Sequence, residues 1–86
     1  MAKKVDSPEV VAQMEEWLAK ASDALHIPVG KVIDLSSDIL DLVGDVSRGP
    51  SRPGAPLTAY LIGYVAGSGG DPEEAVVTLK RLVELE

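Results

Sequence analysis

The chain has 86 residues, and its 14 acidic and 8 basic side chains give a formal net charge of −6. This charge repels phosphate backbones and argues against a nucleic-acid partner. The absence of cysteine excludes disulfides and thiolate metal sites, and a single histidine excludes a His-rich metal site. With no apolar run near the roughly 18 residues of a membrane span and no apolar signal-peptide core, we expect a cytoplasmic protein without a membrane partner.

The N-terminal part of the chain predicts one amphipathic helix. Residues 1–6 are polar and are predicted to be a disordered lead-in to a single helical domain over 7–86. Residues 7–9 supply an N-cap serine, a first-turn proline and an acid for the positive end of the helix. The helix is expected to end near His26, because Pro28 disfavours helical geometry at the residue before it. Its apolar positions are Val10, Met14, Trp17, Leu18, Ala21 and Leu25.

A second helix is predicted after a short irregular stretch. Residues 28–33 contain glycine and proline and are expected to form at most a single helical turn. Ser36 or Ser37 is then expected to cap a helix, and residues 49–50 to stop it. An eight-residue connection with three prolines follows. The apolar stripe of this helix is Ile39, Leu42, Val43 and Val46.

Residues 56–67 form the most apolar stretch and carry no charge. They predict a central helix, apolar nearly all round and therefore buried, with Pro56 at its first helical position and Gly67 as an end signal. Ala59, Gly63 and Gly67 recur every four residues and are expected to leave a groove where a neighbouring backbone approaches. A β-strand is the alternative, but twelve residues is long for a strand and the Ala/Gly content does not suit one.

The last helix begins at Asp71 and Pro72, a cap followed by a first-turn proline, with Glu74 completing a capping box. Four helices with short connections and no alternating segment predict an all-α fold. We expect a compact four-helix bundle with a buried apolar third helix, as a monomer or a homodimer. The apolar positions of the last helix are Ala75, Val76, Leu79, Leu82 and Val83.

Two sets of charged residues are candidate sites. Asp34, Asp38, Asp41 and Asp45 would line one face of the second helix. They suit a hard cation such as Mg²⁺ or Ca²⁺, or a basic partner, although a solvated helix face tolerates the same pattern.

Arg48, Arg52 and Thr58 precede or open the central helix, whose free N–H groups and dipole favour an anion. The alternative is that both arginines pair with nearby acids, Arg48 with Asp45 one turn earlier.

The aromatic residues Trp17, Tyr60 and Tyr64 form either a stacking surface or part of the core, and core packing is favoured in a chain without phenylalanine. His26 is interpreted as a capping residue at a helix end. No histidine pair, nucleophile elbow or phosphate loop is present, so we expect neither catalysis nor a cofactor or metal.

The chain contains Leu40-Asp-Leu-Val-Gly-Asp-Val-Ser-Arg48, followed by Arg52-Pro-Gly-Ala-Pro-Leu-Thr58. Around these motifs, residues 38–67 resemble a small domain of unknown function from high-GC bacteria. That family pairs a Leu-Asp-Leu-x-x-Asp-Val-Ala-His helix with an Arg-Pro-Ala-Ala-Pro-Leu-Thr connection, and Arg48 stands where its histidine usually lies. The domain is often appended to, or encoded beside, proteins similar to the molybdenum-cofactor guanylyltransferase, and it has no established activity. The matching residues are Asp41, Asp45, Arg52, Pro53, Pro56, Leu57, Thr58, Gly63 and Gly67.

The resemblance implies a non-catalytic accessory or interaction module. Its expected partner is a protein such as a molybdenum-cofactor guanylyltransferase-like enzyme, and its expected pathway is the biosynthesis of molybdopterin-guanine dinucleotide. Two other functions stay open. One is a domain that binds a small anion, such as a nucleotide or a pterin phosphate, and the other is a homodimerising structural domain built on the glycine groove.

Overall fold

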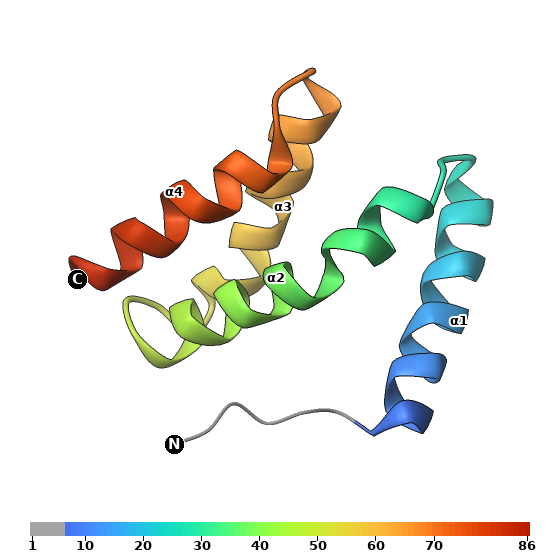
Figure 1. The fold of residues 1–86 in the computed structure, drawn as a ribbon, viewed down its shortest axis with the longest axis horizontal. Coiled ribbons are helices and arrows are strands. Elements are labelled where there is room, and N and C mark those ends of the chain that lie inside the picture. Colours follow the sequence, from blue (N-terminus) through green and yellow to red (C-terminus); the bar gives the residue numbers. More distant parts are fainter. Residues whose placement is uncertain (1–6) are drawn as a thin grey trace. The chain divides into compact units, whose positions relative to one another are not determined.

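The computed structural model describes residues 7–86, which form four α-helices and no strand (Figure 1). The all-α prediction with four helices is therefore confirmed. None of the helices in this part of the chain is long and apolar enough to cross a membrane. The predicted lead-in, residues 1–6, lies outside the described residues. The helices are α1 (Pro8–Leu25), α2 (Gly30–Arg48), α3 (Gly54–Gly67) and α4 (Pro72–Glu84).

The structure divides into two compact units between Asp34 and Leu35. The first contains α1 and the beginning of α2, and the second contains the rest of α2 together with α3 and α4. The single domain expected over 7–86 stays a prediction. The apolar core and the candidate site described below both lie in the second unit.

Three helices supply the core of the second unit. Leu42 and Ile62 expose only 0% and 2% of their surface, so both side chains are fully inserted between the helices. Burying a side chain of this size contributes about 1.5–3 kcal/mol. The complete cluster is Leu42 and Val46 from α2, Ala55 and Ile62 from α3, and Val76 from α4, surrounded by the half-buried Ile39, Val43, Ala75, Leu79 and Val83.

The helix starts predicted for α1 and α4 are confirmed. The Ser7 hydroxyl accepts a hydrogen bond from the backbone N–H of Val10 at 3.3 Å. The Asp71 carboxylate accepts bonds from the N–H groups of Glu73 and Glu74, at 2.9 and 3.4 Å. A proline follows each cap, where its missing N–H costs no hydrogen bond.

The start predicted for α2 is wrong. The two candidate capping serines, residues 36–37, lie inside the helix. The helical hydrogen bonds begin earlier, where the Ile33 N–H donates to the Val29 carbonyl at 3.1 Å. Leu35 is buried, so the apolar stripe of α2 extends one turn further back than the sequence pattern suggested. Burial of this leucine favours helix over the irregular stretch that glycine and proline predicted.

α3 is buried on one side only. Ala55 and Ile62 are buried, whereas Leu57, Tyr60 and Tyr64 each expose about two thirds of their surface. The burial predicted for α3 is confirmed for the first side. The exposure of the second side corrects the expectation that neighbours cover this helix nearly all round. The difference arises because an evenly apolar helix does not encode which of its sides meets the core.

α1 ends in a Schellman motif, in which a residue of left-handed conformation closes the helix. That residue is His26, with φ of 59°, and its N–H donates to the Asp23 carbonyl at 3.1 Å. The next N–H, from Ile27, donates to the Ser22 carbonyl at 2.9 Å. His26 is thus the capping residue that the sequence indicated.

α3 begins at Gly54, two residues before the predicted first position Pro56, because the proline-rich connection already turns into helix there. It ends at Gly67 as predicted, and the same motif closes it two residues later. Gly69 has φ of 92°, and its N–H donates to the Ala66 carbonyl at 3.2 Å. The N–H of Gly70 donates to the Val65 carbonyl at 2.8 Å. Gly67 is therefore the last helical residue, and Gly69 is the residue whose conformation requires glycine.

The expected approach of a backbone to the glycines of α3 is wrong for the described part of the chain. A side chain added at Gly63 or Gly67 would meet nothing within 4 Å. Both residues are exposed. The glycine groove therefore supplies no contact surface within residues 7–86, and Gly63 weakens α3 through its low helix propensity.

We expect Leu42→Ala to lower the free energy of unfolding by about 2–5 kcal/mol, since it removes buried methyl groups and leaves a cavity. Leu40→Ala is the matched control, because Leu40 lies on the same helix with half of its surface exposed. Urea unfolding of both variants provides the measurement. Equal losses would contradict the position of the core.

We expect replacement by alanine to have opposite effects on stability at Gly63, inside α3, and at Gly69, which closes the helix. Gly63→Ala should raise the free energy of unfolding by about 0.5–1 kcal/mol, because alanine favours the helix and the space is open. Gly69→Ala should lower it by about 1 kcal/mol or more, because alanine is strained at positive φ. Thermal unfolding shows whether each variant is more or less stable than the wild type. A Gly63→Ala variant less stable than the wild type would show that Gly63 packs against a neighbouring residue.

Candidate functional site

An open groove of about 480 Å³ lies between α3 and α4 in the second unit. The two helices pack against each other, and a short connection turns the chain back so that α4 lies beside α3 (Figure 1). Leu61, Tyr64 and Val65 form much of the wall on α3, and Ala75, Thr78 and Leu79 form the wall on α4. Ile62 lies at the base, and Asp71 and Glu74 complete the lining.

Exposed apolar side chains continue both walls of the groove. On α3, Leu57, Leu61 and Tyr64 recur at spacings of four and three residues and therefore lie along one side of the helix. On α4, Leu82 follows Thr78 by four residues and extends that wall toward the C-terminal end. Leu57 and Leu82 expose 66% and 51% of their surface. The groove thus belongs to a longer apolar strip.

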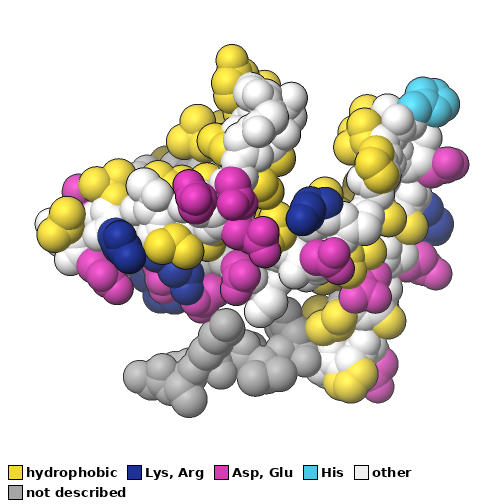
Figure 2. Space-filling model, turned by 45° about the horizontal axis from the view of Figure 1, so that its top comes forward, with side chains coloured by type: hydrophobic (Ala, Val, Ile, Leu, Met, Phe, Trp, Pro, Cys, Tyr) yellow, Lys and Arg dark blue, Asp and Glu magenta, His cyan; other side chains and the backbone are white. Residues whose placement is uncertain are grey.

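The charged side chains that line the groove are acidic. α3 contains no charged side chain, so every charge near the groove comes from other segments. The first turn of α4 carries Glu73 and Glu74 next to the capping Asp71. Within residues 7–86 neither glutamate makes an ion pair. On the surface visible in Figure 2, hydrophobic side chains likewise lie among acidic ones.

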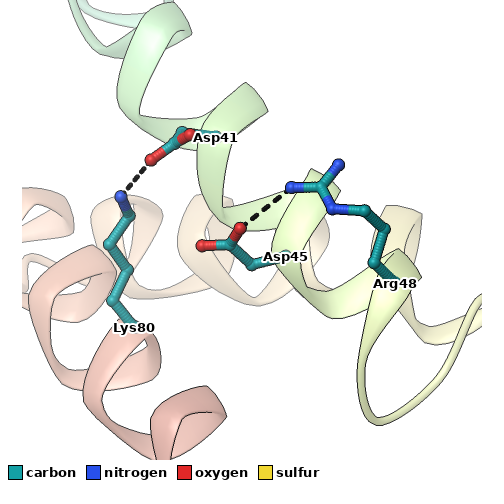
Figure 3. Close-up of polar contacts among 4 residues, drawn as sticks. All are labelled: Asp41, Asp45, Arg48 and Lys80. Atoms are coloured by element: carbon teal, nitrogen blue, oxygen red, sulfur yellow. Dashed lines mark hydrogen bonds and ion pairs between the residues drawn. The ribbon is translucent and has the colours of Figure 1, made fainter. Parts of the chain in front are cut away.

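The predicted acidic stripe of α2 contacts basic side chains of the chain itself. Asp41 forms an ion pair with Lys80 of α4 (Figure 3). Asp45 pairs at 3.0 Å with Arg48, three residues later on the same helix. Asp34 and Asp38 are exposed. Among residues 7–86, no group of three or more acidic or histidine side chains is placed to hold a metal ion.

The Asp41–Lys80 pair changes the titration of the lysine. The hydrogen bond that Lys80 donates to the Asp41 carboxylate raises the pKa of Lys80 above its ordinary value of 10.5. Partial desolvation opposes this rise, and the negative charges of Asp45 and Asp38 add to it. The lysine therefore stays protonated and bound to α2 at neutral pH. Three acids of the predicted stripe thus raise the pKa of one lysine of the same chain.

The residues of the candidate anion site already have partners or lie in solvent. Arg48 binds Asp45, which is the alternative considered from the sequence. Arg52 is exposed and makes no ion pair within residues 7–86. Thr58 donates its hydroxyl to the Gly54 carbonyl at 2.8 Å, one turn earlier in α3. Within residues 7–86, no hydrogen bond or ion pair joins these three side chains to one another.

The N–H groups that open α3 are also in use. The Gly54 N–H donates to the Ser51 hydroxyl at 3.0 Å, and the Ala55 N–H donates to the Arg52 carbonyl at 3.2 Å. Pro56 has no N–H. The start of α3 therefore offers an anion fewer donors than the sequence suggested, because the proline-rich connection folds back and caps the helix itself.

The aromatic side chains lie on the surface, so the prediction that they pack in the core is wrong. Trp17 exposes 65% of its surface, Tyr60 71% and Tyr64 66%. Leucine, isoleucine and valine fill the core of the second unit instead. Tyr64 lines the groove, and it is the only aromatic among the lining residues.

Sequence reasoning missed two features of this region. It assigned Leu61 to the interior of a buried helix, although this residue is exposed beside the groove. It also gave no partner for Lys80, which binds Asp41 of α2. The spacing of Glu74 and Thr78 on one side of α4 is a signal that could have shown which wall faces the groove.

The described residues define an all-α protein with four helices and an open apolar groove. Residues 9–86 match the model of a protein family described as a domain of unknown function, DUF6457, and the chain belongs to that family. This confirms the resemblance to a domain of unknown function, while the association with guanylyltransferase-like proteins stays a prediction. No curated protein and no solved structure matches the chain.

We expect Lys80→Met to lower the free energy of unfolding at pH 8 by about 0.5–1 kcal/mol. The raised pKa of Lys80 means that this stabilisation is complete below pH 10.5 and is lost as the pH rises through the native value. The difference between the wild type and Lys80→Met should therefore shrink above pH 10.5.

Arg48→Met is the matched control for this ion pair, because the Arg48 side chain is 72% exposed and its partner lies on the same helix. It should change stability by only a few tenths of a kcal/mol. Urea unfolding of the three proteins across the alkaline range provides the measurement. A difference for Lys80→Met that grows above pH 10.5 would contradict the assigned role.

Proposed function

We propose that this domain is a non-catalytic interaction module that binds a protein partner through the groove between α3 and α4. The observation that carries the proposal is the exposed, uncharged side of α3. Leu57, Tyr60, Leu61 and Tyr64 of α3 each expose more than half of their surface, and Leu61 and Tyr64 line the open groove. Contiguous exposed apolar surface on a small protein is typical of interaction sites.

The composition of this surface also favours protein binding. Tyrosine is enriched at energetically important interface positions, because it provides large contact area together with a hydroxyl group. Tyr64 lines the groove and Tyr60 lies one turn before it on α3. The absence of charge on α3 suits the centre of an interface, where charged residues are depleted.

The partner to test first is a molybdenum-cofactor guanylyltransferase-like enzyme in the cytoplasm, which the family resemblance suggests. In this proposal the domain acts on molybdopterin-guanine dinucleotide biosynthesis by binding the enzyme, without chemistry of its own. The anion-binding alternative receives less support, because Thr58 and the first N–H groups of α3 are already hydrogen-bonded. Self-association through the groove is tested alongside the enzyme.

Leu61→Glu is expected to weaken binding of the purified guanylyltransferase-like protein by about tenfold or more, since it places a charge in the apolar strip. Val77→Glu is the matched control, because Val77 is half exposed on α4 and does not line the groove. Isothermal titration calorimetry measures both affinities, and circular dichroism verifies that both variants stay folded.

Three outcomes of this titration separate the parts of the proposal. Weaker binding by Leu61→Glu with unchanged binding by Val77→Glu supports the groove as the binding surface. Equal affinities of the two variants would reject the groove. A wild type that does not bind the enzyme would reject this partner.

A further inference from the structure

We propose that the groove between α3 and α4 takes an amphipathic helix of the partner, with lysine or arginine at the end that lies against the first turn of α4. This inference rests on the proposed function and specifies the chemistry of the partner. It depends on three properties of the second unit, which are the shape of the groove, the spacing of its apolar residues and the position of its acids.

The shape of the groove fits a helix. Two packed helices leave a trough between them, and a third helix fills such a trough through one apolar face. The core of the second unit contacts one side of the α3–α4 pair through Leu42 and Val46 of α2. The groove is open, so a helix can enter without unfolding either wall.

The spacing of the side chains on both walls sets which positions of the partner helix should be apolar. Leu57, Leu61 and Tyr64 follow the spacing of one helix side, and so do Ala75, Thr78 and Leu82. A partner helix with apolar residues at i, i+4, i+7 and i+11 would contact both walls over about three turns. A peptide bound as an added β-strand would instead need an exposed sheet edge, and residues 7–86 contain no strand.

The charges beside the groove decide which charge the partner helix should carry. Glu74 lines the groove, Glu73 is its neighbour, and neither pairs with a cation within residues 7–86. Lys80, the nearest lysine along α4, is held by Asp41 on the side of α2. Arg81 lies in the last turn of α4, far along the helix from the two glutamates. A cationic end of the partner helix is therefore attracted to the first turn of α4.

The two glutamates also stabilise α4 through its dipole, which would explain their presence without a partner. The cap of α4, however, is formed by Asp71, whose carboxylate accepts hydrogen bonds from the backbone N–H groups of Glu73 and Glu74. A second copy of this chain is a poorer occupant than a basic helix, because two chains of net charge −6 repel each other.

The experiment selects binders from a displayed library of helical peptides of about five turns. Leucine is fixed at i, i+4, i+7 and i+11, and the flanking positions are randomised among Lys, Glu and Gln. The targets are the full chain, Glu74→Lys, Glu84→Lys and Leu61→Glu. Glu84→Lys is the matched control, because it changes the net charge equally from the exposed last residue of α4.

We expect the full chain and Glu84→Lys to enrich helices with lysine at one end, and Glu74→Lys to lose this preference. The best peptide should bind Glu74→Lys about two- to fivefold more weakly than Glu84→Lys at low salt, and the difference should shrink with added salt. Leu61→Glu should bind none of the selected helices tightly.

Three results would overturn the inference. Enriched helices without a preference for lysine would reject the charge assignment, while their loss in Leu61→Glu would leave the interaction module intact. A library that yields no helix would reject this class of partner, and the calorimetric titration with the enzyme would still judge the proposed function separately. A dimer in sedimentation that Leu61→Glu dissociates would make a second copy the occupant.

Discussion

The second unit depends on the insertion of Leu42 and Ile62 between its three helices. These two side chains, with Val46, Ala55 and Val76, form its buried apolar cluster. A cluster of this size covers only one side of each helix. α3 contains more apolar residues than such a core accommodates, and the surplus lies on the surface beside α4. The small core and the exposed groove thus have one cause.

Local signals in the sequence predicted the helices well, and packing decided the rest. Ser7 and Asp71 cap their helices as expected, because a capping side chain acts within three residues. The start of α2 was missed, since the burial of Leu35 in the helix outweighs the glycine and proline before it. The exposed side of α3 was missed for a related reason. Uniform apolarity predicts a helix, but it does not say which side the core covers.

The candidate site was predictable only where its contacts are local. The pairing of Arg48 with Asp45 follows from helical spacing, and the structure contains it. The pairing of Asp41 with Lys80 joins residues 39 positions apart, so no local pattern indicates it. The predicted acidic stripe does contact a basic side chain. That side chain is Lys80 from α4 of the same chain, so the contact joins α4 to α2.

The order of the core residues along the chain has a consequence for how the second unit folds. α2, α3 and α4 follow one another directly, and only short connections separate them. Closing a short connection costs little chain entropy, and contacts between successive helices have low sequence separation. A protein of this topology folds in microseconds to milliseconds. The core of the second unit therefore forms from contacts among three successive helices, and none of these contacts has to wait for a partner.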